Sequence, residues 1–156
     1  MFSFPMIFKS ESNSRSGTQQ KWKASSYNSS ITCSIPPEFG GPGNGFSPED
    51  LYAQALTNCF LATFKVYAEA SKVDFENVSV KSQLTVDLNE IGKPVMKDLI
   101  LDVTILGAKN QRRIQTIAEK AFSSGFILNS VKTNTELKLT IIDSHNETHI
   151  ENEVGG

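Results

Sequence analysis

The sequence predicts an α+β fold in which antiparallel β-sheets surround a long central helix. Two segments, 78–88 and 99–105, alternate apolar and polar residues, as strands with one buried face do. Two others, 48–71 and 110–124, carry apolar residues at the i, i+3, i+4 spacing of a helix face. The expected order is front strands, a long helix, a hairpin, a second helix and a last strand, which is typical of an α+β chain.

Composition limits the classes of function that fit. The chain has 156 residues, of which 38% are hydrophobic, which is enough for one domain with its own core. Its net charge of −2 gives no basic surface for nucleic acid. No run reaches the roughly 20 apolar residues of a membrane span, and the start does not resemble a signal peptide. With only two cysteines, we expect a cytoplasmic protein without a nucleic-acid or membrane partner.

The front of the chain is rich in expected strands, at 4–10, 19–27 and 30–35. A loop over 36–47 follows, in which glycines and prolines exclude regular structure. It ends at Ser47, which has the character of a helix N-cap, and Pro48 suits the first helical position.

The long helix is expected from about 48 to 71. One of its faces comprises Leu51, Ala55, Leu56, Cys59, Phe60, Thr63, Phe64 and Tyr67. Leu61, Ala62 and Val66 extend the apolar surface around most of the circumference. A helix that is apolar nearly all round is buried from more than one side, and a chain this short has little to cover it.

The remaining elements follow in order. The turn at 89–94 joins the two alternating segments into a hairpin. A helix over 110–124 and a strand over 135–142 complete an expected single domain over 1–143. The polar segment 144–156 is expected to be a flexible tail.

Cys59 is the residue with the clearest chemical potential, although local sequence alone favours packing in the core, the more ordinary role of a free cysteine. The thiolate is its reactive form, and a helix lowers the pKa of a thiol mainly near the helix N-terminus. Cys59 lies about three turns into the helix, so its activation needs a cation from elsewhere. Glu49 is a favourable first-turn acid in its own right. Cys33, in an alternating strand, is expected to be structural.

Other chemistries lack their motifs. The pair His145 and His149 does not have the glutamate spacing of a zinc protease. The stretch 40-GGPGNG-45 lacks the pattern of a phosphate-binding loop. We therefore expect no metal and no cofactor.

The series 36-PPEFGGPGNGFSPEDLYAQALTNCFLATF-64 resembles the OsmC/Ohr family of osmotically inducible and organic hydroperoxide resistance proteins. The shared pattern is a proline, a Gly-Gly stretch, a Pro-Glu-x-Leu helix start and a cysteine ten residues after the glutamate. The resemblance covers about residues 4–143. It implies an intertwined homodimer with the long helices at its centre.

The resemblance also implies a chemistry. Cys59 would be the peroxidatic thiol, which attacks a hydroperoxide and becomes a sulfenic acid. Glu49 and an arginine from the front strands would keep it ionised, and Arg15 is the only arginine before residue 112. Peroxidases of the family carry a second cysteine after the second helix, and Gly125 or Ser124 stands where it is expected.

Two functions therefore remain open at the level of sequence. One is a peroxidase that uses Cys59 alone, takes an organic hydroperoxide as substrate and is recycled by an external thiol. The other is a non-catalytic protein that binds a small apolar ligand or senses redox state. Pairing of Arg15 with Glu49 over the cysteine would favour the first.

Overall fold

The computed structural model describes residues 2–143 and 149–155. Where one domain over 1–143 was expected, contacts group the chain into two compact units, Met1–Tyr52 and Ala53–Gly156. The long helix α1, Pro48–Ala70, begins in the first unit and continues in the second. The described residues form two α-helices, two short 3-10 helices and seven strands in two sheets.

The first unit contains a three-stranded antiparallel sheet of β1 (Glu11–Asn13), β2 (Trp22–Ser26) and β3 (Ser29–Cys33). The last two strands overlap the segments that the sequence predicts, with small differences at their ends. The expected strand over 4–10 is wrong, because this segment has no ladder partner in the described chain. Its apolar side chains are exposed there: Phe2, Phe4, Met6, Ile7 and Phe8 border or belong to it.

The glycine-rich loop folds back onto β3 and delivers the chain to α1. It opens with the 3-10 helix η1, Pro37–Phe39. The amide of Phe46 donates to the carbonyl of Thr32, and the amide of Ser34 donates to the carbonyl of Phe46. A Cβ atom on Gly41 would clash with the backbone of Ile35, so this close approach requires glycine.

The helix α1 begins at Pro48, as the sequence predicts, and reciprocal hydrogen bonds fix this start. The hydroxyl of Ser47 accepts from the amide of Asp50 at 3.0 Å, and the Asp50 carboxylate accepts from the amide of Ser47 at 2.9 Å. This arrangement is a capping box, which satisfies two backbone donors that a helix start leaves free. It therefore sets where the helix begins and, with it, the rotational position of every later residue.

The second unit contains a four-stranded sheet in the order β4-β5-β6-β7. Its strands are β4 (Asn77–Leu88), β5 (Pro94–Leu106), β6 (Asn134–Ile142) and β7 (His149–Gly155). The hairpin of β4 and β5 confirms the sequence prediction. The expectation of purely antiparallel sheets is wrong, because β5 and β6 run parallel. They are joined by helix α2, Gln111–Ser124, and a crossover helix is the usual link between parallel strands.

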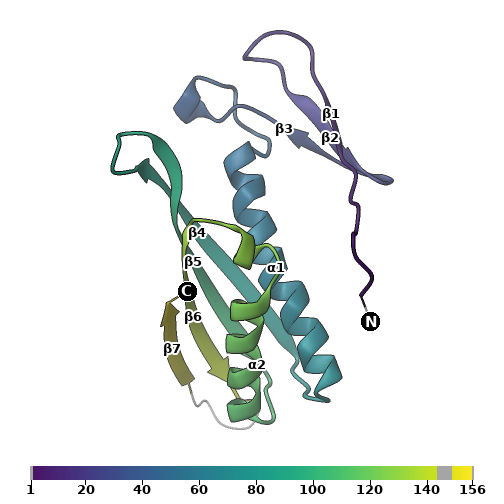
Figure 1. Cartoon of the computed structure of the whole chain (residues 1–156), viewed down its shortest axis with the longest axis vertical. Helices are drawn as coiled ribbons and strands as arrows, with labels where there is room; N and C mark the ends of the chain where they lie inside the picture. The colour runs from purple at the N-terminus through teal and green to yellow at the C-terminus, as the bar shows by residue number, and fades with distance from the viewer. Residues whose placement is uncertain (1, 144–148, 156) are drawn as a thin grey trace. The chain divides into compact units, whose positions relative to one another are not determined.

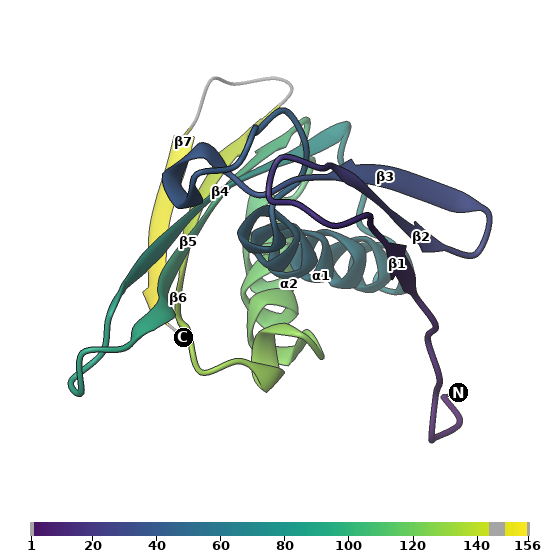
Figure 2. The same ribbon diagram turned by 90° about the horizontal axis from the view of Figure 1, so that it is seen from above.

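The two helices lie on one face of this sheet in both views (Figures 1 and 2). The core between them consists of alternate residues of the two central strands and the inner faces of the helices. From the strands come Leu99, Leu101, Val103, Ile105, Leu137, Leu139 and Ile141, and from the helices Leu56, Phe60, Phe64, Ile114, Ala118 and Ala121. Burial of this apolar surface is the main force that holds the unit together.

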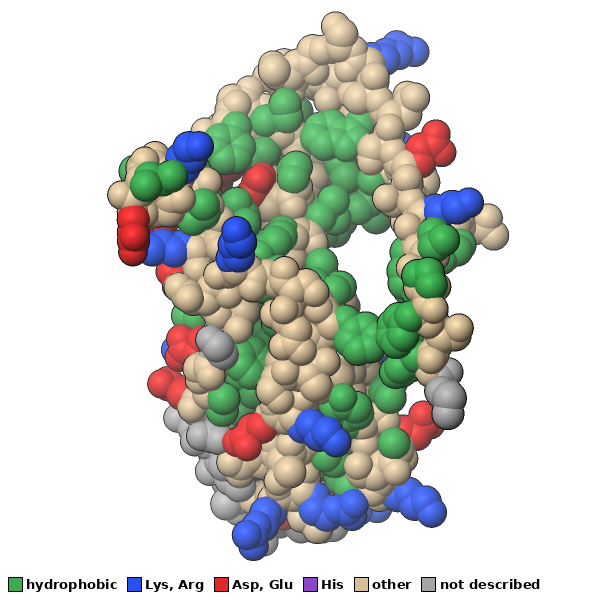
Figure 3. All heavy atoms as spheres, in the orientation of Figure 1, with side chains coloured by type: hydrophobic (Ala, Val, Ile, Leu, Met, Phe, Trp, Pro, Cys, Tyr) green, Lys and Arg blue, Asp and Glu red, His purple; other side chains and the backbone are tan. Residues whose placement is uncertain are grey.

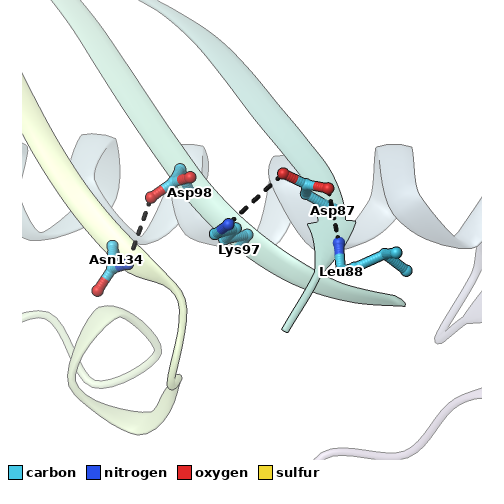
Figure 4. Close-up of polar contacts among 5 residues, drawn as sticks. All are labelled: Asp87, Leu88, Lys97, Asp98 and Asn134. Atoms are coloured by element: carbon cyan, nitrogen blue, oxygen red, sulfur yellow. Dashed lines mark hydrogen bonds and ion pairs between the residues drawn. The ribbon is translucent and has the colours of Figure 1, made fainter. Parts of the chain in front are cut away.

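Polar contacts fix the end of the hairpin near its turn (Figure 4). One Asp87 oxygen accepts from the amide of Leu88 at 2.7 Å, and the other lies 3.5 Å from the ammonium of Lys97. The amide side chain of Asn134 donates to Asp98 at 3.3 Å, which links the start of β6 to β5. These contacts are exposed and set the geometry of the hairpin more than its stability.

The C-terminal segment differs from the flexible tail that its polarity predicts. Strand β7 pairs antiparallel with β6 over seven residues. The strand forms because β6 would otherwise present an unpaired edge of backbone donors and acceptors. Residues 144–148, which belong to the same expected tail, lie outside the described residues.

Candidate functional site

Cys59 lies in the middle of α1 and is half-buried, with a free thiol. Its neighbours Leu56 and Phe60 point into the core and are fully buried. The side chain therefore sits at the border between the packed face of the helix and its open face. A cysteine with only a packing role would more often be fully buried.

Gly125, the residue directly after α2, lies against the thiol of Cys59. A Cβ atom built on this glycine would be 2.7 Å from the Cys59 Sγ and 3.3 Å from Cδ1 of Leu128. The backbone of Gly125 is extended, with φ −62° and ψ 134°, a conformation open to any residue. The glycine is therefore needed for space and not for backbone freedom.

Ser124, the residue before Gly125, faces a later part of α1, at Tyr67. The hydroxyl of Ser124 lies 2.8 Å from that of Tyr67 and also donates to the carbonyl of Lys120 at 2.6 Å. The sequence left open whether position 124 or 125 stands in the place of a second cysteine. The structure favours position 125, since Gly125 lies against the Cys59 sulfur, whereas the hydroxyl of Ser124 lies beside Tyr67.

Glu49 and Arg15 both belong to the first unit. Glu49 is half-buried in the first turn of α1, and Arg15 is exposed just beyond β1. The described residues form ion pairs such as Lys97–Asp87 and Lys138–Glu153, and none is found between Arg15 and Glu49. The pairing that would favour a peroxidase is thus not formed in a single chain.

Cys33 is buried, with 1% of its surface exposed. It pairs with Trp22 across β2 and β3 and forms a bridge with Phe46 of the following loop. These contacts agree with the structural role that the sequence predicts for it.

Sequence reasoning missed the packing of α2 against α1, which determines the surroundings of the thiol. The contacts run along both helices, from Gly125 on Cys59 to the guanidinium of Arg113, which donates to the carbonyl of Ser71 at 2.8 Å. A glycine at the end of a helix usually indicates a left-handed cap, so the residues alone give no signal for this contact. The signal came from the resemblance, which places the second cysteine of relatives at position 124 or 125.

The described residues bring together no group of three or more potential metal ligands. None of the helices described combines the length and the apolar character that a bilayer crossing requires.

Two solved structures show which fold this is. An OsmC-like protein of unknown function from Vibrio cholerae superposes with a TM-score of 0.71 at 17% identity, over 87% of this chain and 100% of the other. An organic hydroperoxide resistance protein from Legionella pneumophila gives a TM-score of 0.67 at 22% identity, over 88% and 98%. The chain therefore has the OsmC-like fold, with two helices and two sheets.

Sequence comparison leads to the same group. An organic hydroperoxide resistance protein of Xanthomonas axonopodis pv. citri is 27% identical over 110 residues, 69% of this chain and 75% of the relative. The uncharacterized protein YmaD of Bacillus subtilis is 26% identical over 111 residues, 68% and 73%. The family model described as OsmC-like protein matches residues 41–140, more than half of the chain. The protein therefore belongs to the OsmC-like family.

Proposed function

We propose that this protein reduces organic hydroperoxides with Cys59 as its only reacting cysteine and an external thiol as reductant. The observation that carries the proposal is the half-buried thiol of Cys59 beside Gly125 in a family that includes named organic hydroperoxide resistance proteins. The proposed chemistry needs a supply of reduced thiols, which fits a cytoplasmic setting.

The proposed cycle has three steps at the Cys59 sulfur. The Cys59 thiolate attacks the terminal oxygen of the hydroperoxide, the O–O bond breaks, and the products are an alcohol and a sulfenic acid. An external thiol then attacks the sulfenic sulfur, releases water and forms a mixed disulfide. A second external thiol completes the reduction, releases Cys59 and leaves with the first as a disulfide.

Activation of Cys59 would require Arg15 and Glu49. Ten residues separate Glu49 from Cys59 on α1, which corresponds to about 15 Å along a helix. A hydrogen bond needs a separation near ~3 Å, so Glu49 of the same chain is too distant. We propose that in a homodimer Arg15 and Glu49 of a second copy of the chain lie beside Cys59, which does not require an ion pair between the two residues within one chain.

The sheet of the second unit supports the homodimer. Strand β4 is an edge strand of twelve residues that pairs with β5 alone. Its residues Val78, Val80 and Leu84 share a face with the fully buried β5 residues opposite them, yet they are only half-buried. A long exposed edge with an open apolar face is a ready surface for pairing with another chain.

The decisive experiment mixes the reduced protein with tert-butyl hydroperoxide in a stopped-flow instrument and follows loss of the thiol. We expect a reaction far faster than that of free cysteine, abolished by Cys59→Ser and retained by Cys33→Ser. Arg15→Ala should slow it and should raise the pH at which iodoacetamide alkylates Cys59. A rate no faster than that of free cysteine would refute the proposal.

The second candidate function is a non-catalytic protein that binds a small apolar ligand or senses redox state. The observation that favours it is the exposed Arg15, which forms no ion pair with Glu49 among the described residues. Under this alternative, Arg15→Ala would leave the alkylation of Cys59 unchanged.

A further inference from the structure

A small basic pocket lies at the other end of the contact between the two helices. Its volume is about 380 Å³, and it is lined by Ser71, Arg112, Arg113, Thr116, Ile117 and Lys120. Figure 3 shows Lys and Arg side chains gathered at the end of the second unit, where α1 ends and α2 begins. All of the lining residues belong to that one unit.

Within the part of the chain that the structure describes, none of the three cations of this pocket has a carboxylate partner. No described Asp or Glu oxygen lies within 4.0 Å of Arg112, Arg113 or Lys120; the ion pairs found among the described residues involve Lys97 and Lys138 instead. The first turn of α2 carries no acidic residue. Arg112 and Arg113 lie in this first turn, at the positive end of the helix dipole, where added positive charge is unfavourable and a bound anion would be favourable.

The three cations differ in how they are held. One Arg113 nitrogen donates to the carbonyl of Ser71 at 2.8 Å, and the Lys120 ammonium lies 5.0 Å from the centre of the Tyr67 ring. The Arg112 guanidinium has no acceptor among the described residues. Two cations are therefore positioned by the fold, and the third is free to engage a ligand.

The arrangement also has a sequence basis. Arg112, Thr116 and Lys120 follow one another at intervals of four, which places them on one face of α2. The pair Arg112-Arg113 on its own predicts only a solvated helix face. In the structure, Ser71 just past the end of α1 lies beside this face, so that Arg112 and Arg113 line a pocket.

We propose that this pocket binds a small oxyanion, the phosphate group of inorganic phosphate or of a phosphate monoester. Arginine presents a planar fork of N–H donors that matches two phosphate oxygens, and lysine adds a point charge. The pocket has room for a phosphate with a small substituent, and Ile117 supplies an apolar wall. The site shares no residue with the proposed Cys59 chemistry and does not depend on it.

The test titrates the full-length Cys59→Ser protein with inorganic phosphate at constant ionic strength, because screening changes with salt. Amide chemical shifts of the ¹⁵N-labelled protein report where binding occurs. We expect saturable shifts centred on Ser71 and on the first two turns of α2. Glycerol phosphate should bind at the same place, whereas acetate should bind more weakly because it has fewer oxygens and a smaller charge.

Variants assign the binding to the pocket. Arg112→Gln and Lys120→Gln should each weaken phosphate binding about tenfold, the usual effect of losing a charged hydrogen bond. Lys81→Gln removes the same charge from the exposed strand β4 and should leave binding unchanged. Arg112→Lys keeps the positive charge but loses the planar guanidinium with its paired N–H donors, so it should retain only part of the wild-type affinity for phosphate.

Two results would overturn the proposal. One is the absence of saturable shifts around the pocket with either phosphate compound. The other is phosphate affinity that falls equally in Lys81→Gln and in the pocket variants, since this indicates only general attraction to net charge. Because Cys59 is absent from the protein tested, neither result bears on the peroxidase proposal.

Discussion

Gly125 and Cys59 are in direct contact, and an added Cβ atom on the glycine would lie 2.7 Å from the Cys59 sulfur. The corresponding separation of a Cβ atom from the partner sulfur in a disulfide is about 3 Å. Position 125 is thus placed where a cysteine could bond to Cys59. The resemblance to two-cysteine relatives left positions 124 and 125 open, and the geometry of this chain favours 125, although the residue there is glycine.

The first prediction introduces that cysteine. In Gly125→Cys, one equivalent of hydroperoxide should produce a disulfide between Cys59 and the introduced thiol, detected by intact mass spectrometry as the loss of two hydrogen atoms. Ser124→Cys is the matched control, because the side chain at 124 faces Tyr67 and should form no such bond. A disulfide in the control and none in Gly125→Cys would contradict the placement.

The second prediction concerns stability. Gly125→Ala should destabilise the protein by about 1–3 kcal/mol, because the new methyl group overlaps the Cys59 sulfur. In a Cys59→Ala background the same change should cost at least ~1 kcal/mol less, since the overlapping atom is gone. Denaturant unfolding of all four proteins measures the coupling. If Gly125→Ala lowers the free energy of unfolding equally in both backgrounds, the Cys59 sulfur is not what excludes a larger side chain at position 125.

The third prediction follows from the absence of a cysteine at 125. Hydroperoxide should convert Cys59 to a sulfenic acid that dimedone traps, and excess hydroperoxide should carry it to the sulfinic form and inactivate the protein. Cys33 is 1% exposed, so we expect it to remain reduced and Cys33→Ser to behave as wild type. A Cys33–Cys59 disulfide in peptide mapping would contradict this.

The extent to which sequence predicted structure depends on whether the signal was local. The start of α1 was predicted because Ser47 and Pro48 act on the backbone next to them. The hairpin was predicted because β4 and β5 bury alternate residues against the same core. The strand expected over 4–10 was wrong because its pairing partner is not specified by the segment itself.

The candidate site was only partly predictable for the same reason. Cys59 and Glu49 stand out through a spacing along one helix, which sequence displays directly. The contact of Gly125 with Cys59 and the pocket at Arg112 arise where α2 packs on α1, between residues far apart in the sequence. A polar composition predicted a flexible tail over 144–156, but the free edge of β6 made part of it strand β7.

The fourth prediction concerns pH at the hairpin. The backbone amide of Leu88, and after it the ammonium of Lys97, lower the pKa of Asp87 below its usual value of 3.8. A lowered pKa means that the ionised form contributes stability above the unfolded-state value, lost as pH falls through the folded value. NMR titration in Lys97→Ala should show a pKa still below 3.8, because the Leu88 hydrogen bond remains. A return to the usual value would make Lys97 the dominant cause.

The fifth prediction concerns the proposed homodimer. Light scattering should give about twice the chain mass of 17.1 kDa, because the apolar face of β4 needs a cover that the described chain does not supply. Val80→Lys places a charge on that face and should shift the equilibrium towards monomer. Ser79→Lys, on the opposite face of the strand, is the control and should leave the mass unchanged. A monomer mass for the unmodified protein at micromolar concentration would remove the proposed source of the second Arg15 and Glu49, and with it the activation of Cys59.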